Sequence, residues 1–222
     1  MTFKRASFRQ YIQRVMREGK PWKPDIFVLQ KEGRQILVKD YFEKSFFFRI
    51  FVGVVAIRRE ALIYRKLQGI PGIPKCYGLI DRYALALEFI PSRNGSELRE
   101  DDLDPAFFDK MRVVIDAVHA RGVVLCDLRN VKNILMGEDG KPYLIDFATA
   151  FQRGGRFNII KNRVYHIFHQ DDILGIAKLK KTRAKHLLSE EERSSLEKGL
   201  FGEKEVKMIR TKGIWFLKKI FG

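Results

Sequence analysis

Three oxygen-bearing side chains in the second half of the chain stand at the ends of short apolar segments. Asp127 follows one such segment, Asn133 opens the next six positions later, and Asp146 closes a third. The last two segments are expected to form a β-hairpin across residues 137–141, which would bring the three side chains together at its root. Carboxylate and amide oxygens suit Mg²⁺, and a carboxylate beside a metal-bound phosphate can orient an attacking hydroxyl.

A lysine and a glutamate in the first half could form a second reactive pair. Lys39 ends a strand that is predicted to be buried, and Glu60 lies on the following predicted helix. A buried ammonium group is costly unless it is paired, so Glu60 is its expected partner. A lysine held in this way can bind nucleotide phosphates. A purely structural ion pair is the alternative.

The elements before residue 91 are predicted to be mostly strands. Residues 26–30 and 35–38 form a predicted hairpin, and residues 75–80 and 83–90 are two further strands. Between them, apolar residues at spacings of three and four predict an amphipathic helix that ends at the glycines and prolines of residues 69–74. Its predicted buried face consists of Phe46, Ile50, Val54, Ile57, Ala61 and Tyr64.

After a loop at residues 91–95 the pattern becomes more helical. Asp104 and Pro105 mark the start of a helix that Gly122 ends, and Ser189 with Glu192 forms a capping box that opens another. Residues 123–126 and the hairpin at 133–145 are short strands between these helices. The predicted buried face of the first helix consists of Phe107, Phe108, Met111, Val114, Ile115 and Val118.

The order of these motifs over residues 25–180 resembles the protein-kinase-like superfamily. The strand with Lys39, the helix with Glu60, and the sequences Glu88-Phe89-Ile90, Val124-Leu125-Cys126-Asp127-Leu128, Asn133-Ile134-Leu135 and Asp146-Phe147-Ala148 follow one another as they do there. Lys39-Asp40-Tyr41, Gly72-Ile73-Pro74 and the compact tail are most similar to the lipopolysaccharide core kinase (Kdo/heptose kinase) family and to RIO-type kinases.

The resemblance implies an α+β, compact two-lobed protein-kinase-like fold with a small β-rich N-lobe and a small, mainly helical C-lobe. The corresponding division is a basic N-terminal segment (1–24), the N-lobe (25–91), the C-lobe (92–188) and a basic C-terminal helical tail (189–222).

The resemblance also implies roles for the first-lobe residues. Lys39 would contact the α and β phosphates of ATP, and Glu60 would pair with Lys39. The backbone of Glu88, Phe89 and Ile90 would hold the adenine.

In the second lobe, Asp127 would be the catalytic carboxylate, and Asn133 and Asp146 would bind Mg²⁺. Arg129 would neutralise the transferring phosphoryl group.

The sequence also departs from the common kinase pattern. Leu125 stands where that pattern has His, no glycine-rich loop precedes Lys39, and Ala148 replaces Gly in the metal-binding triplet. The asparagine follows Asp127 after six residues instead of five, which leaves Asn130 as the alternative metal ligand. No Ala-Pro-Glu motif follows Asp146, so a full peptide-docking lobe is not expected.

The predicted activity is ATP- and Mg²⁺-dependent phosphotransfer to a hydroxyl group, for which a sugar of an anionic glycolipid is the favoured acceptor. Three alternatives remain open: an atypical protein serine/threonine kinase, a catalytically silent kinase-like binding module, and an RNA-associated RIO-like ATPase. The sequence names neither the acceptor nor the oligomeric state.

Composition and charge limit the expected location and binding partners of the protein. The 222 residues carry a formal net charge of +16 and include two cysteines, and no secretory signal or membrane-spanning run is evident. A cytoplasmic location is expected, with a peripheral position on the inner face of the cytoplasmic membrane as an alternative. Most of the excess charge lies before residue 25 and after residue 175, where it could dock on an anionic membrane surface; nucleic-acid binding is disfavoured because no recognised motif accompanies the charge.

Overall fold

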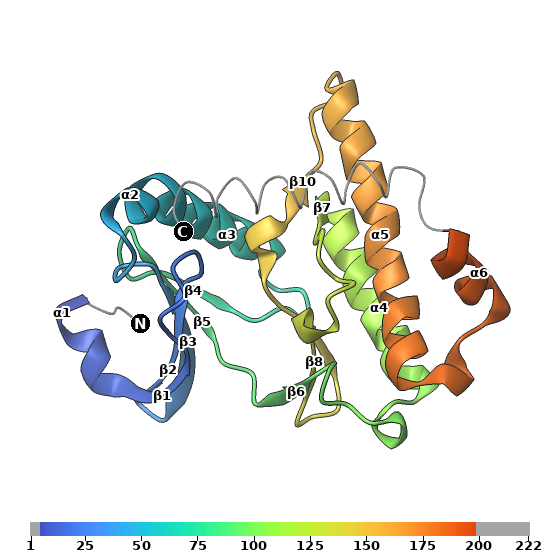
Figure 1. Ribbon diagram of the computed structural model, residues 1–222, viewed down its shortest axis with the longest axis horizontal. Coiled ribbons are helices and arrows are strands. Elements are labelled where there is room, and N and C mark those ends of the chain that lie inside the picture. The colour runs from blue at the N-terminus through green and yellow to red at the C-terminus, as the bar shows by residue number, and fades with distance from the viewer. Residues whose placement is uncertain (1–4, 199–222) are drawn as a thin grey trace. The chain divides into compact units, whose positions relative to one another are not determined.

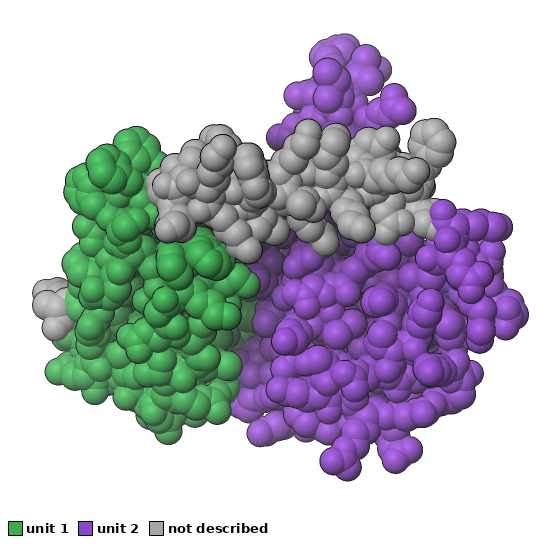
Figure 2. Space-filling view, in the orientation of Figure 1, with its two compact units in different colours: residues 1–65, 74–89, 204–222 green, residues 66–73, 90–203 purple. Residues whose placement is uncertain are grey.

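The computed structural model describes residues 5–198, which form an α+β fold of two compact units (Figures 1 and 2). Within this range, unit 1 contains residues 5–65 and 74–89, and unit 2 contains residues 66–73 and 90–198. Unit 1 is rich in strands and unit 2 is mainly helical, as the sequence predicts.

Unit 1 is built on an antiparallel five-stranded sheet with the order β1-β2-β3-β5-β4. The predicted hairpin is confirmed, and its register runs from Lys31 opposite Arg34 to Asp25 opposite Asp40. Phe8, Phe27, Ile36 and other apolar side chains form the core beside this sheet. The strands are β1 (Ile12–Arg17), β2 (Asp25–Lys31), β3 (Arg34–Asp40), β4 (Cys76–Leu79) and β5 (Ala84–Glu88).

The structure differs from the sequence analysis in the N-terminal segment, for which no element is predicted. Residues 5–17 form α1 (Arg5–Phe8), η1 (Arg9–Tyr11) and β1, and β1 pairs with β2 at the edge of the sheet. The residues of β1 are mostly exposed, so they lack the apolar alternation that marks a half-buried strand.

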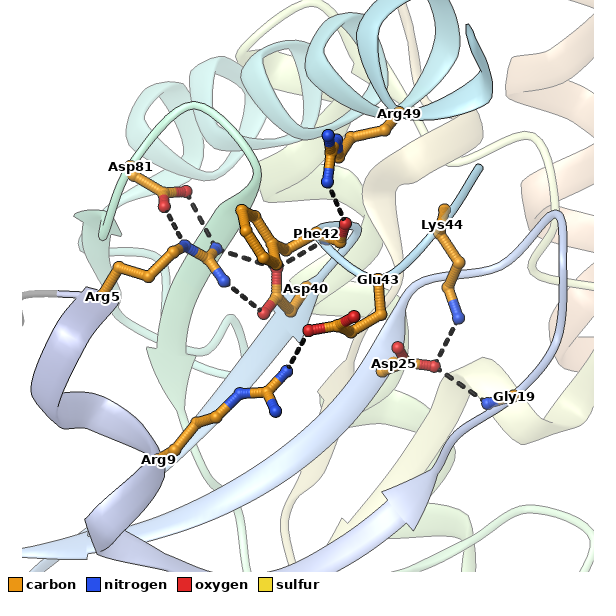
Figure 3. A network of polar contacts seen from close by, with 10 residues as sticks. All are labelled: Arg5, Arg9, Gly19, Asp25, Asp40, Phe42, Glu43, Lys44, Arg49 and Asp81. Carbon is orange, nitrogen blue, oxygen red and sulfur yellow. Dashed lines mark hydrogen bonds and ion pairs between the residues drawn. The ribbon is translucent and has the colours of Figure 1, made fainter. Parts of the chain in front are cut away.

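The first helix of the segment is attached through Arg5, which forms ion pairs with Asp40 and Asp81 (Figure 3). Arg9 pairs with Glu43. Arg5 and Arg9 therefore have partners inside unit 1, although the charge of residues 1–24 is expected from the sequence to serve docking.

The long helix after the hairpin is confirmed, but its buried face has a different phase. It consists of α2 (Phe46–Phe48), the π-helical segment η2 (Arg49–Gly53) and α3 (Val54–Leu67). The wider π-helical turn adds a residue between successive contacts, so Phe48 and Gly53 are buried while Phe46 is 60% exposed. From Ile57 onward the predicted face is correct, since Ile57, Ala61 and Tyr64 are buried.

Unit 2 has two long helices beside short strands. The Asp104 cap is confirmed because its Oδ1 accepts the Phe107 amide at 2.7 Å, and the capping box of Ser189 and Glu192 is present. The predicted hairpin corresponds to β8 and β9. The elements are β6 (Ser92–Asn94), η3 (Glu100–Asp102), α4 (Pro105–Ala120), β7 (Val123–Val124), η4 (Val131–Asn133), β8 (Ile134–Gly137), β9 (Pro142–Leu144), η5 (Phe147–Thr149), β10 (Phe151–Gln152), α5 (Ile159–Arg183), η6 (Lys185–Leu187) and α6 (Glu190–Lys198).

Most of the basic C-terminal helical tail expected at residues 189–222 lies outside the described residues, which end at Lys198. Within residues 5–198, none of the helices has the length and hydropathy needed to cross a bilayer.

Candidate functional site

Unit 1 brings Lys39 and Glu60 together in its interior. Lys39 lies on β3, between Ile26 of β2 and Leu85 of β5, and so occupies a central strand of the sheet. Its Nζ lies 2.6 Å from Oε1 of Glu60 on α3, and both side chains are buried. The geometry therefore holds an ammonium group at a fixed place with an anionic partner.

The expected adenine-binding segment lies at the end of β5. The Glu88 amide donates to the Lys75 carbonyl at 2.8 Å, and the Glu88 carboxylate accepts the Lys75 amide at 2.9 Å. The guanidinium of Arg14 lies over the Phe89 ring, and the Ile90 carbonyl accepts the Ser92 hydroxyl. The backbone is therefore ordered here, and its contact with adenine stays a prediction.

Unit 2 brings Asp127 and Asn133 together. The Asn133 amide group donates through Nδ2 to the backbone carbonyl of Asp127 at 3.0 Å and to its carboxylate at 3.3 Å. Asn133 is buried, whereas Asn130 is exposed and lies 3.4 Å from the same carboxylate. Asn133 ends the short η4 helix, and the choice between the two asparagines as metal ligand stays a prediction. Because Nδ2 faces Asp127, the side-chain oxygen of Asn133 is the atom that remains for a metal ion.

The residues that flank Asp146 are hydrogen-bonded to the segments that carry Asn133 and Asp127. The amide of Ile145 donates to the Asn133 carbonyl at 3.0 Å, and the Thr149 hydroxyl donates to the Leu125 carbonyl at 3.3 Å. These two bonds tie the residues on either side of Asp146 to the segment that carries Asp127. Asp146 itself has a left-handed backbone (φ 65°, ψ 67°), a conformation that aspartate tolerates better than most residues.

The backbone before Asp127 is also left-handed, because Cys126 has φ 65°. Such a residue costs on the order of 1–3 kcal/mol and persists only where the surroundings hold it. Asp172 of α5 does so: its carboxylate accepts the amides of Leu125 at 2.8 Å and Cys126 at 3.1 Å. We therefore regard Asp172 as a positioning residue for Asp127.

Asp172 has a third partner in His119 of α4, whose Nε2 lies 3.0 Å from its carboxylate. Burial raises the pKa of Asp172, while the hydrogen bonds from His119 and from the two backbone amides oppose that rise. His119 lies in the last turn of α4, and its link to Asp172 joins α4, α5 and the Asp127 segment.

The Arg129 side chain contacts α5. Its guanidinium forms an ion pair with the buried Asp171 at 3.4 Å, so its expected role in neutralising a phosphoryl group stays a prediction. Next to this pair, Gly175 lets α5 approach the chain closely, because a Cβ there would lie 2.9 Å from Leu128.

Sequence reasoning missed α5 and its two carboxylates. The helix has polar residues on most sides, so its periodicity is weak, yet Asp171 and Asp172 are adjacent acids within a stretch that otherwise lacks acidic residues. The two adjacent acids were the signal in the sequence that this segment has a specific role. Buried carboxylates need hydrogen-bond or ionic partners, which the fold supplies here.

The oxygen donors suit a magnesium ion that keeps other ligands. Among residues 5–198, no group of three or more His, Cys, Asp and Glu side chains is placed to hold a metal ion. Asn133 and Asp146 would supply two oxygens, and Mg²⁺ is usually held by few protein groups together with phosphate and water. The donor set therefore fits Mg²⁺ bound with a nucleotide better than a metal held by the protein alone.

The two units and their motifs define the protein-kinase-like class of fold. In particular, the chain is similar to two crystal structures of Rio2 kinase from Chaetomium thermophilum. One is an ADP/Mg²⁺-phosphoaspartate complex, with a TM-score of 0.57 and 18% identity, and the match covers 82% of this chain and 59% of that one. The other has a TM-score of 0.61 and 16% identity, and the match covers 82% and 60%.

The chain thus spans about 60% of the length of the Rio2 kinase structures that it matches. No protein-family model matches the sequence, and no curated protein sequence is significantly similar to it. At these identities the comparison shows the fold, and it does not distinguish the lipopolysaccharide core kinases from the RIO-type kinases.

Proposed function

We propose that this chain is an ATP- and Mg²⁺-dependent phosphotransferase that transfers the γ-phosphate of ATP to a hydroxyl group. The observation that carries the proposal is the pairing of Asn133 with Asp127. Asn133 orients the Asp127 carboxylate, which accepts or orients the proton of the acceptor hydroxyl. The ordered site makes positioning the main contribution to catalysis.

The remaining residues have matching roles in the proposal. Lys39, fixed by Glu60, binds nucleotide phosphates, and the backbone of residues 88–90 binds adenine. Asn133 and Asp146 hold Mg²⁺, which when bound offsets negative charge on the phosphate oxygens. Arg129, two residues after Asp127 and paired with Asp171, neutralises the transferring phosphoryl group in this proposal.

The acceptor that we propose is a sugar hydroxyl on an anionic glycolipid. The resemblance of the motifs to lipopolysaccharide core kinases and the net charge of +16 support it. A protein serine or threonine is the second acceptor class.

An RNA-associated ATPase of RIO type is a further candidate, because the motifs also resemble RIO-type kinases and the net charge is +16. Since one of the Rio2 kinase structures contains phosphoaspartate, an aspartate of this chain could take the γ-phosphate and release it to water. A hydroxylamine-sensitive label on the protein would identify that path.

The test is an assay with γ-labelled ATP and Mg²⁺ in which glycolipid, protein and RNA acceptors are compared. Asp127→Asn should lower transfer by at least about a hundredfold, the size of a lost general base. Asp109→Asn, at an exposed position of α4, is the matched control and should leave transfer unchanged. If the wild type binds ATP but is as inactive as Asp127→Asn with every acceptor, the chain is a silent binding module and the proposal is wrong.

A further inference from the structure

The N-terminal end of α5 presents three large apolar side chains to solvent. Phe157 is 90% exposed, Ile160 81% and Ile159 78%, which are the highest values for large apolar residues in the described part of the chain. Single exposed apolar residues are ordinary, but three within four positions form a patch that normally indicates a binding surface. These residues are called the apolar tip below.

The apolar tip projects from its own unit. In Figure 1 the N-terminal end of α5 extends beyond the other elements of unit 2, and in Figure 2 the same end stands out as a knob. A projecting helix end with bulky apolar side chains can insert into a lipid bilayer without a conformational change in the rest of the unit.

The charged residues that flank the apolar tip in the sequence are all basic. No Asp or Glu occurs between Asp146 and Asp171, and the same stretch contains Arg153, Arg156, Lys161 and Arg163. The three arginines are exposed. An apolar centre with cations around it matches a bilayer surface, where acyl chains lie just below anionic headgroups.

The apolar tip is also held in place. Asn158 caps α5 by accepting the Lys161 amide at 3.0 Å, and Asn162 bonds to both the Gly154 amide and the Gly155 carbonyl. A Cβ on Gly154 would lie 3.0 Å from Asn158, so this close turn favours glycine. Because the loop is already ordered, binding would cost little further conformational entropy.

We propose that the apolar tip inserts into the interface of a membrane that contains anionic lipids, with Arg153, Arg156 and Arg163 at the headgroups. The residues of this surface, 153–163, lie outside the basic terminal segments in the sequence, and the proposal does not depend on the proposed phosphotransfer. Exposed apolar side chains flanked by arginines, with no acidic residue between Asp146 and Asp171, match the apolar interior and anionic headgroups of such a membrane.

Binding of the full chain to vesicles tests the proposal. The protein should co-sediment with vesicles of equimolar phosphatidylcholine and phosphatidylglycerol more than with phosphatidylcholine alone. The double variant Phe157→Ser with Ile160→Ser should bind at least about tenfold more weakly, or ~1.4 kcal/mol. The double variant Arg156→Gln with Arg163→Gln should lose most of the preference for phosphatidylglycerol.

The control is Phe47→Ser with Phe51→Ser, which removes two exposed apolar side chains of unit 1 (65% and 66% exposed, less than the 90% and 81% of the tip) and should bind as the wild type does. A direct measure of contact is Phe157→Trp, whose added emission should be quenched by brominated lipid. Thermal melting should be unchanged in every variant, because the replaced side chains are exposed.

Three results would overturn the proposal. The wild type could fail to bind the mixed vesicles, the serine variant of the tip could bind as well as the wild type, or the emission added by Phe157→Trp could be insensitive to brominated lipid. Loss of self-association in the tip variant, with vesicle binding retained, would instead assign the apolar tip to contact with a second copy.

Discussion

The carboxylate of Asp172 accepts a hydrogen bond from the backbone amide of Cys126, the left-handed residue directly before Asp127. A second amide, that of Leu125, bonds to the same carboxylate. Asp172 is fully buried, so these bonds and the contact with His119 offset the cost of its burial. The conformation of the Asp127 segment therefore depends on a residue 45 positions later in the chain.

Asp172→Ala should lower the free energy of unfolding by about 3 kcal/mol or more, because it leaves two buried amides without an acceptor. Asp172→Asn keeps one carbonyl oxygen and should cost less, while phosphotransfer should fall in both variants. Chemical denaturation measures the change, and Asp109→Ala on the exposed side of α4 should stay within about 0.5 kcal/mol of the wild type. Equal stability of Asp172→Ala and Asp109→Ala would show that the hydrogen bonds of Asp172 are not needed for stability.

Replacement of Lys39 distinguishes a phosphate-binding lysine from a structural one. Lys39→Met leaves Glu60 buried without its partner and should cost about 3–5 kcal/mol. The double variant Lys39→Met with Glu60→Leu should regain most of this stability, since an apolar pair can replace a buried ion pair. It should not regain ATP turnover, because no ammonium remains to bind phosphate.

A second buried ion pair in unit 1 provides the control for this experiment. Lys44 and Asp25 lie 2.6 Å apart and are as buried as Lys39 and Glu60 (Figure 3). Lys44→Met with Asp25→Leu should therefore keep its turnover. If the double variant of Lys39 and Glu60 recovered turnover, that ion pair would be structural only. The proposal that Lys39 binds phosphate would then be wrong.

The two asparagines near Asp127 should differ in their effect on magnesium dependence. Asn133→Ala removes a buried side chain bonded to Asp127, so the Mg²⁺ concentration for half-maximal ATP turnover should rise at least about tenfold. Asn130→Ala, at an exposed position, should leave it within about twofold. The measurement is a magnesium titration at saturating ATP, and the reverse ranking would transfer the metal role to Asn130.

The N-terminal segment should contribute to stability through Arg5 more than through Arg9. Arg5→Ala leaves the buried Asp40 without its ion pair and should cost about 2–3 kcal/mol. Arg9 and Glu43 are both about half exposed, so Arg9→Ala should cost less than about 1 kcal/mol. Urea unfolding measures both. Similar values for the two would mean that α1 is not attached through Arg5.

Mild acid should destabilise the protein partly through His169. Burial lowers the pKa of His169, and electrostatic interaction with His119, His166 and Arg112 lowers it further, while Asp116 opposes them. The folded state then binds fewer protons than the unfolded state, so stability falls as pH drops below about 6.5, the unfolded pKa. His169→Phe should reduce this loss, as thermal melts at neutral and mildly acidic pH would show. An unchanged pH dependence would exclude His169 as its source.

Several local structures follow from neighbouring residues and were predictable. The Asp104 cap, the Ser189 capping box and the hairpin of β2 and β3 each depend on groups a few positions apart, so their chemistry is visible in the sequence. The helix after β3 was predicted from its periodicity. Its phase was not, because the π-helical turn at residues 49–53 shifts which side chains are buried.

For the candidate site, the sequence by itself determined the chemistry: the identities and order of Lys39, Glu60, Asp127, Asn133 and Asp146 are fixed by the chain. The tertiary structure alone decided which groups meet. It buries Asn133 and gives it a second bond, to the Asp127 carbonyl, whereas Asn130 bonds to the same carboxylate from an exposed position. It also recruited Asp172, since a hydrogen bond between residues more than 40 positions apart depends on how α5 packs, and no local pattern encodes that distance.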